Sequence, residues 1–289
     1  MRLAAIAFLL GIGIHFACGR TSAEPASAPA CRVVQQGKQV ELHSPYFVFR
    51  LDIASGLQAH SWENRLAGRT LSLGGGLELE FDLGLPDEPL QTPKLEVSNV
   101  AVKAHGETGE VVFRLDAEEP AAAAVVTYRW NADEPVLRKF VTAANKGSKP
   151  WNRLLAVRLG RYDLGDAQVI DKPSGGTYSV PAPREFPSSE GTHVERGFPV
   201  YADDEFFFTV AHPAGVAEGA DGKVSLRQYP GALLPPGETF RCMEAVYGVA
   251  KAGEARRTFL AHVRGRTRRV ARGHDKPYAI FEPFGARPN

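Results

Sequence analysis

The chain has 289 residues, of which 44% are hydrophobic and 23% charged, so it can bury the core of one large domain or two small ones. Its formal net charge of +1 excludes a strong overall field for nucleic acid or anionic lipid. Its 29 glycines and 21 prolines predict many turns and exclude long helical bundles.

The first 23 residues have the features of a secretory signal. Arg2 precedes an apolar run from Leu3 to Ile14, which is shorter than the about 20 residues that a membrane-spanning helix needs. Small residues follow, so we expect cleavage after Ala23 and a secreted or periplasmic product without a transmembrane span. Two alternatives stay open, a buried N-terminal helix and a lipid anchor at Cys18. Residues 24–31 would form a flexible tether.

Cleavage would leave 32 basic and 33 acidic residues and two cysteines, Cys31 and Cys242. Two cysteines in an exported protein can form one disulfide. A bridge between them would close a loop of about 210 residues and stabilise the fold by about 5 kcal/mol at most. The alternative is a pair of buried free thiols.

Segments with alternating or branched apolar residues recur along the chain and predict β-strands. Leu77–Leu83 alternates strictly, which would place its four apolar side chains on one sheet face. The apolar spacing between Leu95 and Val102 predicts a strand with a bulge near Asn99. The other expected strands are residues 46–53, 112–115, 125–130, 137–142, 154–159, 205–211, 223–228 and 240–249.

Turn-forming residues such as Gly74–Gly76 and Pro235–Gly237 separate most of these strands. The pattern predicts an all-β fold, a sandwich of antiparallel sheets over residues 32–272. The stretch 171–197, rich in proline, glycine and serine, is expected to be a long loop of the kind that often carries function.

One segment has helical instead of strand periodicity. Residues 252–263 predict a short amphipathic helix with four apolar residues on one side. These are Ala255, Phe259, Leu260 and Val263. The arginines that follow favour a solvated segment over a nucleic-acid patch, so no nucleic-acid partner is expected. They are Arg264, Arg266, Arg268, Arg269 and Arg272.

The familiar motifs of cofactor, phosphate and metal binding are missing from the sequence. There is no Gly-x-Gly-x-x-Gly fingerprint, no Gly-Lys-Ser/Thr phosphate loop and no Gly-x-Ser-x-Gly elbow, and the eight histidines lack metal-ligand spacing. We therefore predict no cofactor and no metal. A Ser-His-Asp triad stays open, because its members need no proximity in sequence.

The three tryptophans are candidate sugar contacts because sugars stack on aromatic rings. Trp130 lies in an alternating strand and is expected in the core. Trp62, within the polar run Ser61–Asn64, and Trp151, at the start of a strand, are expected to be either half-exposed or packed in the core.

A carboxylate triplet, Asp203–Glu205, precedes an apolar strand that ends at His212. Paired carboxylates can do acid–base work or bind calcium. Three adjacent side chains splay apart, however, which favours a turn that protects a sheet edge. His212 is either a structural histidine or a base.

Several segments, taken together in their order and spacing, resemble a known family. They are Gly56–Asn64 with Gly68–Arg69, Pro150–Leu155, Gly197–Tyr201 with Asp203–Phe207 and Ala211–Gly215, Gln228–Gly231 with Pro236–Glu238, and Tyr278–Gly285. Over residues 45–289 the chain resembles the N-terminal β-supersandwich domain of alpha-galactosidase (melibiase)-like glycoside hydrolases.

In that family a catalytic (β/α)₈ barrel follows the sandwich. The resemblance implies a sandwich whose barrel is absent, with residues 273–289 similar to the lead-in to it. Ala211 stands where relatives often have glutamate. Galactose mutarotases share the sandwich shape, but the local motifs that hold their catalytic histidine and glutamate are not found here.

Three functions follow as hypotheses. The first is an exported, non-catalytic carbohydrate-associated sandwich that binds glycans or docks a separate glycoside hydrolase barrel. The second is a stand-alone mutarotase-like epimerase or small glycosidase with His212 and Asp203 or Asp204 as acid and base. The third is a fragment of a longer enzyme, with Phe281 and Phe284 once packed on a barrel. The candidate carbohydrate-binding residues are Trp62, Glu63, Asn64, Trp151, Tyr201, Asp203, Asp204 and His212.

Overall fold

A computed structural model describes residues 30–170, 179–181, 193–195 and 198–266. The expected signal segment with Cys18, most of the tether, most of the long loop and the segment 273–289 lie outside this part of the chain. So do Arg268, Arg269 and Arg272.

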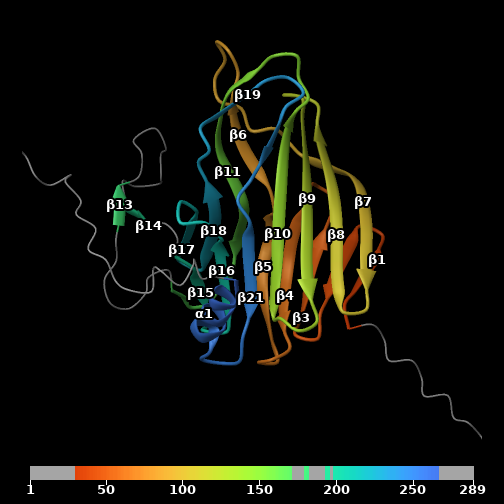
Figure 1. Cartoon of the computed structure of the whole chain (residues 1–289), viewed down its shortest axis with the longest axis vertical. Helices are drawn as coiled ribbons and strands as arrows, with labels where there is room; N and C mark the ends of the chain where they lie inside the picture. Colours follow the sequence, from red (N-terminus) through yellow and green to blue (C-terminus); the bar gives the residue numbers. More distant parts are fainter. Residues whose placement is uncertain (1–29, 171–178, 182–192, 196–197, 267–289) are drawn as a thin grey trace, which may run out of the picture.

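The described residues form strands and one late helix (Figure 1). The first strands are β1 (Arg32–Gln36), β2 (Gln39–His43), β3 (Phe47–Asp52), β4 (Gln58–Asn64), β5 (Arg69–Leu77), β6 (Glu80–Gly84), β7 (Glu96–His105), β8 (Thr108–Ala117), β9 (Ala122–Asn131), β10 (Val136–Asn145) and β11 (Trp151–Asp163). The later elements are β12 (Val169–Ile170), β13 (Ser179–Pro181), β14 (His193–Glu195), β15 (Val200–Ala202), β16 (Phe206–Val210), β17 (Val216–Ala220), β18 (Lys223–Gln228), β19 (Ala232–Leu234), β20 (Thr239–Arg241), β21 (Ala245–Val249) and α1 (Ala255–Arg266).

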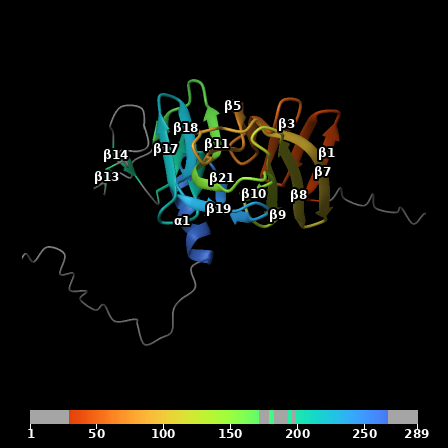
Figure 2. The ribbon, with the colours of Figure 1, turned by 90° about the horizontal axis from the view of Figure 1, so that it is seen from above.

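These strands pack as a two-layered antiparallel sandwich (Figure 2). One layer is a nine-stranded sheet in the order β12-β15-β16-β21-β10-β9-β8-β7, with β20 also paired to β10. The other layer contains two five-stranded sheets, β1-β2-β3-β4-β5 and β17-β18-β11-β19, the second including β6 next to β11. The predicted all-β supersandwich with one short late helix is confirmed.

The two five-stranded sheets meet where β5 lies against β11. A Cβ atom on Gly76 would lie only 1.9 Å from the carbonyl oxygen of Arg161, so only glycine permits this approach of the two backbones. The close approach lets both sheets face the large sheet as one layer.

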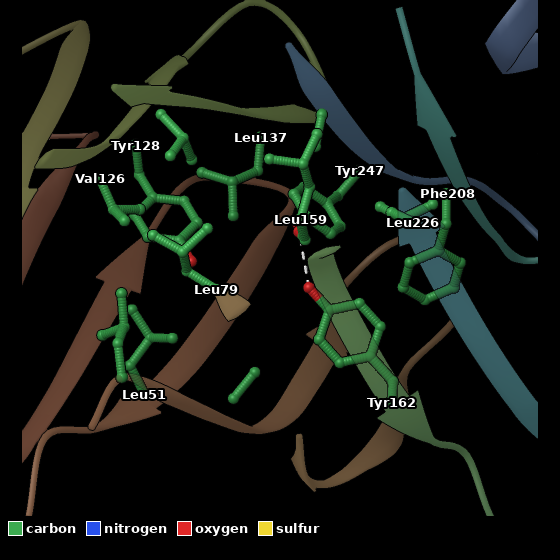
Figure 3. Packing of buried hydrophobic residues seen from close by; sticks show 14 of the residues in the cluster. Leu51, Leu79, Val126, Tyr128, Leu137, Leu159, Tyr162, Phe208, Leu226 and Tyr247 are labelled. Carbon is green, nitrogen blue, oxygen red and sulfur yellow. Dashed lines mark hydrogen bonds between the residues drawn. The ribbon is translucent and has the colours of Figure 1, made fainter. Parts of the chain in front are cut away.

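Aromatic and aliphatic side chains fill the space between the layers (Figure 3). Tyr162 and Tyr247 bring their hydroxyl groups into this core, where Tyr162 hydrogen-bonds Tyr247 at 2.9 Å. Tyr247 in turn donates to the carbonyl oxygen of Leu159 at 3.0 Å. The buried hydroxyl groups are therefore satisfied within the core, as burial in an apolar environment requires.

Several strand predictions match the structure closely. β18 has the predicted bounds, and the predicted bulge near Asn99 is present as a register shift between Val97 and Asn99 in β7. Leu77–Leu83, in contrast, is not one strand, because β5 ends at Leu77 and β6 begins at Glu80. The intervening Glu78 is fully buried, which alternation did not predict. Residues 240–249 are likewise divided between β20 and β21.

The helix begins and ends three residues later than predicted, and its buried side differs. Ala255 is buried and Phe259 packs on the sheet, as expected. Leu260 and Val263 remain 40% and 39% exposed. The side chain of His262 is only 6% exposed, because it turns toward Glu134 and forms a hydrogen bond with it.

The proposed Cys31–Cys242 disulfide is not formed, and both residues are buried free thiols. The Cys31 thiol donates to the carbonyl oxygen of Glu107 in the β7–β8 turn, whereas the backbone of Cys242 pairs with Val141 on β10. The two cysteines are therefore held near β8 and β10, which lie two strand spacings, about 10 Å, apart. A disulfide needs Cα atoms within about 7 Å, so the bridge cannot form.

Candidate functional site: the groove beside helix α1

A groove with a volume of about 770 Å³ runs between α1 and the outer face of strands β16 and β21. We call it the α1 groove. Helix α1, which borders the groove, lies at the lower end of the molecule in Figure 1. Its lining residues are Phe198, Pro199, Thr209, Val210, Ala211, His212, Pro213, Glu244, Val246, Arg256, Phe259, Leu260, His262, Val263 and Arg266.

The β15–β16 turn sets the start of α1. Asp203 and Asp204 have φ angles of 51° and 52°, which aspartate tolerates better than most residues. The turn places the Asp204 carbonyl oxygen 3.2 Å from the backbone nitrogen of Ala255, whose N–H donates to it. The predicted turn at the triplet is therefore present, but it protects no sheet edge, because β16 lies between β15 and β21 within the large sheet.

An aromatic contact holds α1 on the sheet. The ring of Phe259 lies 5.4 Å from that of Phe207 and 6.4 Å from that of Tyr201. Phe207 lies over Gly248 on the neighbouring strand, where a Cβ atom would be 1.9 Å from the ring. The half-buried Tyr201 therefore supports the helix, and burial raises the pKa of its hydroxyl to about 12.

The exposed apolar side of the helix faces the groove. Leu260 and Val263 are one helical turn apart and both line it, together with Phe198 from the segment before β15. Because these side chains keep about two fifths of their surface exposed, the groove offers apolar area that the described part of the chain leaves uncovered.

Two sets of paired charges border the apolar surface. Arg138 donates to both carboxylate oxygens of Glu244, and Arg266 lies 3.6 Å from Glu244 Oε1. His262 Nδ1 is hydrogen-bonded to Glu134. The hydrogen bond with His262, together with the nearby Arg266 and Arg138, lowers the pKa of Glu134.

Three of the eight predicted sugar-contact residues, Trp62, Asn64 and Trp151, are buried. Trp62 and Trp151 are 0% and 1% exposed, so no sugar can stack on them. In β4 the side chains of Trp62 and Asn64 point into the core, while Ser61 and Glu63 are only partly buried. Ser61 and Glu63, two of the polar neighbours that left exposure of Trp62 open, thus belong to the opposite face of the strand.

The remaining polar candidates have structural partners. Asn64 is fully buried and donates to the carbonyl oxygens of Glu205 and Ala250. Glu63 pairs with Arg50 and Arg65 at 2.8 and 3.3 Å.

The acid–base pairing expected for a mutarotase-like enzyme is not formed. Asp203 and Asp204 precede β16 and His212 follows it, so the five residues of the strand hold them about 17 Å apart. Arg69 neutralises Asp203 at 2.8 Å. His212 is exposed at the groove and accepts a hydrogen bond at Nδ1 from the Ala214 N–H at 3.0 Å. These residues cannot act together on one substrate.

The sequence did not single out Glu244 and His262, which line the groove, or Glu134 and Arg138, which pair with them. None of the four belongs to a local motif. The one available signal was the spacing of His262 from Ala255 and Phe259, which places it on the packed side of the helix.

A second hollow, of about 610 Å³, lies at the β7–β8 edge. Its lining includes the charged residues Lys94, Glu96, Asp116, Glu118 and Glu119. Within the described ranges no group of three or more histidine, cysteine or acidic residues could hold a metal ion. The part of the chain that is described also contains no helix with the length and apolar character of a membrane span.

Comparison with known proteins identifies the fold. No family model and no curated protein matches the sequence. Among solved structures, a GH36 alpha-galactosidase from Geobacillus stearothermophilus is 14% identical with a TM-score of 0.51, over 77% of this chain and 41% of that one. The galactosidase domain of an alpha-galactosidase–sucrose kinase is 12% identical with a TM-score of 0.53, over 77% and 42%.

A protein provisionally assigned as an aldose 1-epimerase, from Klebsiella pneumoniae, is 8% identical with a TM-score of 0.50, over 81% of this chain and 86% of that one. At these identities the likeness is one of fold. The chain therefore has the antiparallel supersandwich that alpha-galactosidase and mutarotase-like proteins share, and it spans about two fifths of the alpha-galactosidase chains.

Proposed function

We propose that this chain is an exported, non-catalytic, carbohydrate-associated sandwich module that docks a glycoside hydrolase catalytic barrel through the α1 groove. The observation that carries the proposal is the uncovered apolar surface of the groove, bordered by paired charges. The likeness to about two fifths of an alpha-galactosidase supports the choice of partner.

The groove has the composition of a protein interface. Leu260 and Val263 supply an apolar centre, and Glu244 with its two arginines supplies a polar border. Protein interfaces combine a dehydrated apolar centre with a polar rim in this way. Contiguous exposed apolar surface on a soluble protein commonly marks such a contact.

Glycan binding, the other form of this hypothesis, has weaker support. Trp62 and Trp151 are core residues, and Tyr201 packs against Phe259. A sugar site needs several converging polar groups and an open aromatic face. In the described part of the groove, most polar groups are already paired with one another.

The test is a calorimetric titration of the chain with an alpha-galactosidase-type (β/α)₈ barrel from the same genome, produced as a separate protein. We expect one-to-one binding that weakens at least about tenfold in Leu260→Asp and in Val263→Asp, because each change places a charge in an apolar contact. Leu233→Asp is the matched control, since Leu233 is 63% exposed on β19 at the opposite end of the molecule (Figure 1). No binding, or equal weakening by all three changes, would contradict the proposal.

Titration with galactose and raffinose at millimolar concentration separates docking from glycan binding. We expect no heat of binding. Heat that disappears in His212→Ala would replace the docking function with a sugar site in the same groove.

A stand-alone epimerase is the second candidate, favoured by the match over 86% of the aldose 1-epimerase-like chain. If it applies, His262 and Glu134 at the groove would have to replace the separated His212 and Asp203. Polarimetry of freshly dissolved alpha-galactose tests this directly. We expect the spontaneous rate, and an acceleration that His262→Ala abolishes would establish the enzyme instead.

A further inference from the structure

Lys139 on β10 and Glu78, between β5 and β6, meet at the centre of the sandwich. Both side chains are 0% exposed. The Lys139 ammonium donates to the carbonyl oxygen of Glu78 at 2.9 Å and also to its carboxylate Oε2. The backbone N–H of Glu78 is bonded to the Leu57 carbonyl oxygen, which fixes its position. The contact thus joins the two layers of the fold.

Tyrosines surround this pair. Tyr128 donates its hydroxyl to the same Oε2 that Lys139 contacts. The Lys139 nitrogen lies 5.3 Å from the ring centre of Tyr247 and 5.7 Å from that of Tyr128. Burial raises the pKa of both tyrosines well above its ordinary value, so both hydroxyl groups are neutral.

As an ion pair, this arrangement is incompletely satisfied. Glu78 Oε1 is buried and has no hydrogen-bond partner in the described part of the chain. Removing two charges from water is expensive unless their remaining hydrogen-bonding positions are filled. Burial also lowers the pKa of Lys139, which favours the neutral amine, the form that can attack a carbonyl carbon.

We propose that Lys139 and Glu78 condense into an intramolecular amide that covalently links the two layers of the sandwich. One proton first passes from the Lys139 ammonium group to the Glu78 carboxylate, which leaves a neutral amine and a carboxylic acid. The Nζ lone pair then attacks the carboxyl carbon Cδ, a bond forms between them, and the bond from Cδ to Oε2 breaks. A second proton passes from Nζ to Oε2, which leaves as water. Oε1 remains as the amide oxygen and one proton remains on Nζ, so charge and atoms balance without an oxidant.

Two features of the site favour this step. Holding the amine against the carboxyl group replaces a collision between separate molecules with a fixed contact. The Tyr128 hydroxyl stabilises negative charge on Oε2 as that oxygen departs. The product carries no net charge, so the dry core no longer holds two ions.

The molecule contains its own control. Lys149 and Glu88 form an ion pair at 2.7 Å, but their side chains are 60% and 32% exposed. Water competes at that pair, and both groups stay charged. We expect no amide there.

The test is peptide mapping of the purified full chain by mass spectrometry after denaturation. We expect a single linked peptide that contains Glu78 and Lys139 and is lighter than its two parts by one water molecule, whereas the Lys149 and Glu88 peptides separate. Glu78→Gln should give the identical linked peptide by releasing ammonia instead of water. Lys139→Met should give two separate peptides.

Tyr128→Phe provides the kinetic test. We expect the linked peptide to accumulate more slowly in this variant after refolding from denaturant, because Oε2 loses its donor. Wild-type protein that yields separate Glu78 and Lys139 peptides of full mass would overturn the proposal and leave an ordinary buried ion pair. This outcome needs no variant to fold.

Discussion

The centre of the sandwich and the α1 groove each contain a carboxylate paired with a basic side chain, but in different surroundings. Glu78 and Lys139 are fully buried among tyrosines, whereas Glu134 is 31% exposed beside His262. The central pair joins the two layers of the sandwich. The groove pair positions one helix, and the described residues leave apolar surface beside it uncovered. The comparison separates the part of the chain that stabilises the fold from the part available to a partner.

Among the changes that compare the core with the groove, substitution of Trp62 should lower the free energy of unfolding most. Its ring lies 5.5–6.3 Å from those of Phe47, Phe49, Phe206, Phe208 and Tyr247. Trp62→Ala should lower the free energy of unfolding by about 3–5 kcal/mol, measured in urea, because it leaves a cavity in the core. Phe259→Ala, at the partly buried contact between α1 and the sheet, should lower the free energy of unfolding clearly less. Equal losses would contradict the distinction between core and groove.

Asn64 should come next in the size of its effect on stability, because it connects β4 to Glu205, just before β16, and to Ala250, just after β21. Its amide donates to the Ala250 carbonyl oxygen at 2.7 Å, and its Oδ1 accepts from the Leu66 N–H at 2.9 Å. Asn64→Ala should cost about 1–3 kcal/mol, the penalty for unpaired buried polar groups. Asn64→Asp keeps the acceptor and loses the donor, so it should also destabilise. If thermal unfolding of either variant equals that of the wild type, this role is wrong.

Substitution of Glu134 should have a smaller effect on stability, and one that depends on pH. Because the folded state lowers its pKa, its contribution to stability is present at neutral pH and is lost as the pH falls below the ordinary glutamate value of about 4. Partial exposure limits this contribution to under about 1 kcal/mol. The difference in melting temperature between wild type and Glu134→Gln should therefore shrink from pH 7 to pH 3. A difference that grows on acidification would contradict the pairing.

A reducing agent should have no effect on stability. The structure has Cys31 and Cys242 as free thiols, and burial raises their pKa values to about 11 and about 12. Both should react with iodoacetamide only after denaturation. Reduction of a disulfide would cost about 2–5 kcal/mol of stability. A fall in melting temperature with dithiothreitol would therefore contradict the free thiols and support a Cys31–Cys242 disulfide.

The sequence predicted the sheet architecture well because alternation is a local property. β18 and the bulge in β7 follow from the spacing of apolar side chains alone. Glu78 was not predicted as a core residue, because its burial depends on Lys139, 61 positions away. Alternation assigns such a residue to the solvent face unless the distant partner is known.

The candidate site was predictable only in part. The role of Tyr201 and His212 as sugar contacts stays a prediction; in the structure Tyr201 packs against α1 and His212 lines the groove. For Trp62 the sequence left two alternatives open, half-exposed or packed in the core, and the structure has the second, because the polar Ser61 and Glu63 lie on the other face of β4. The pairing of His262 with Glu134 depends on how the helix packs, which helical spacing alone does not determine.

Calorimetry of the chain with the alpha-galactosidase-type barrel at several temperatures tests the central proposal most directly. We expect binding with a negative heat-capacity change, the signature of apolar burial, and its loss in Leu260→Asp. Binding without a heat-capacity change, or galactose epimerisation by the chain alone without any binding, would contradict a docking function for the α1 groove.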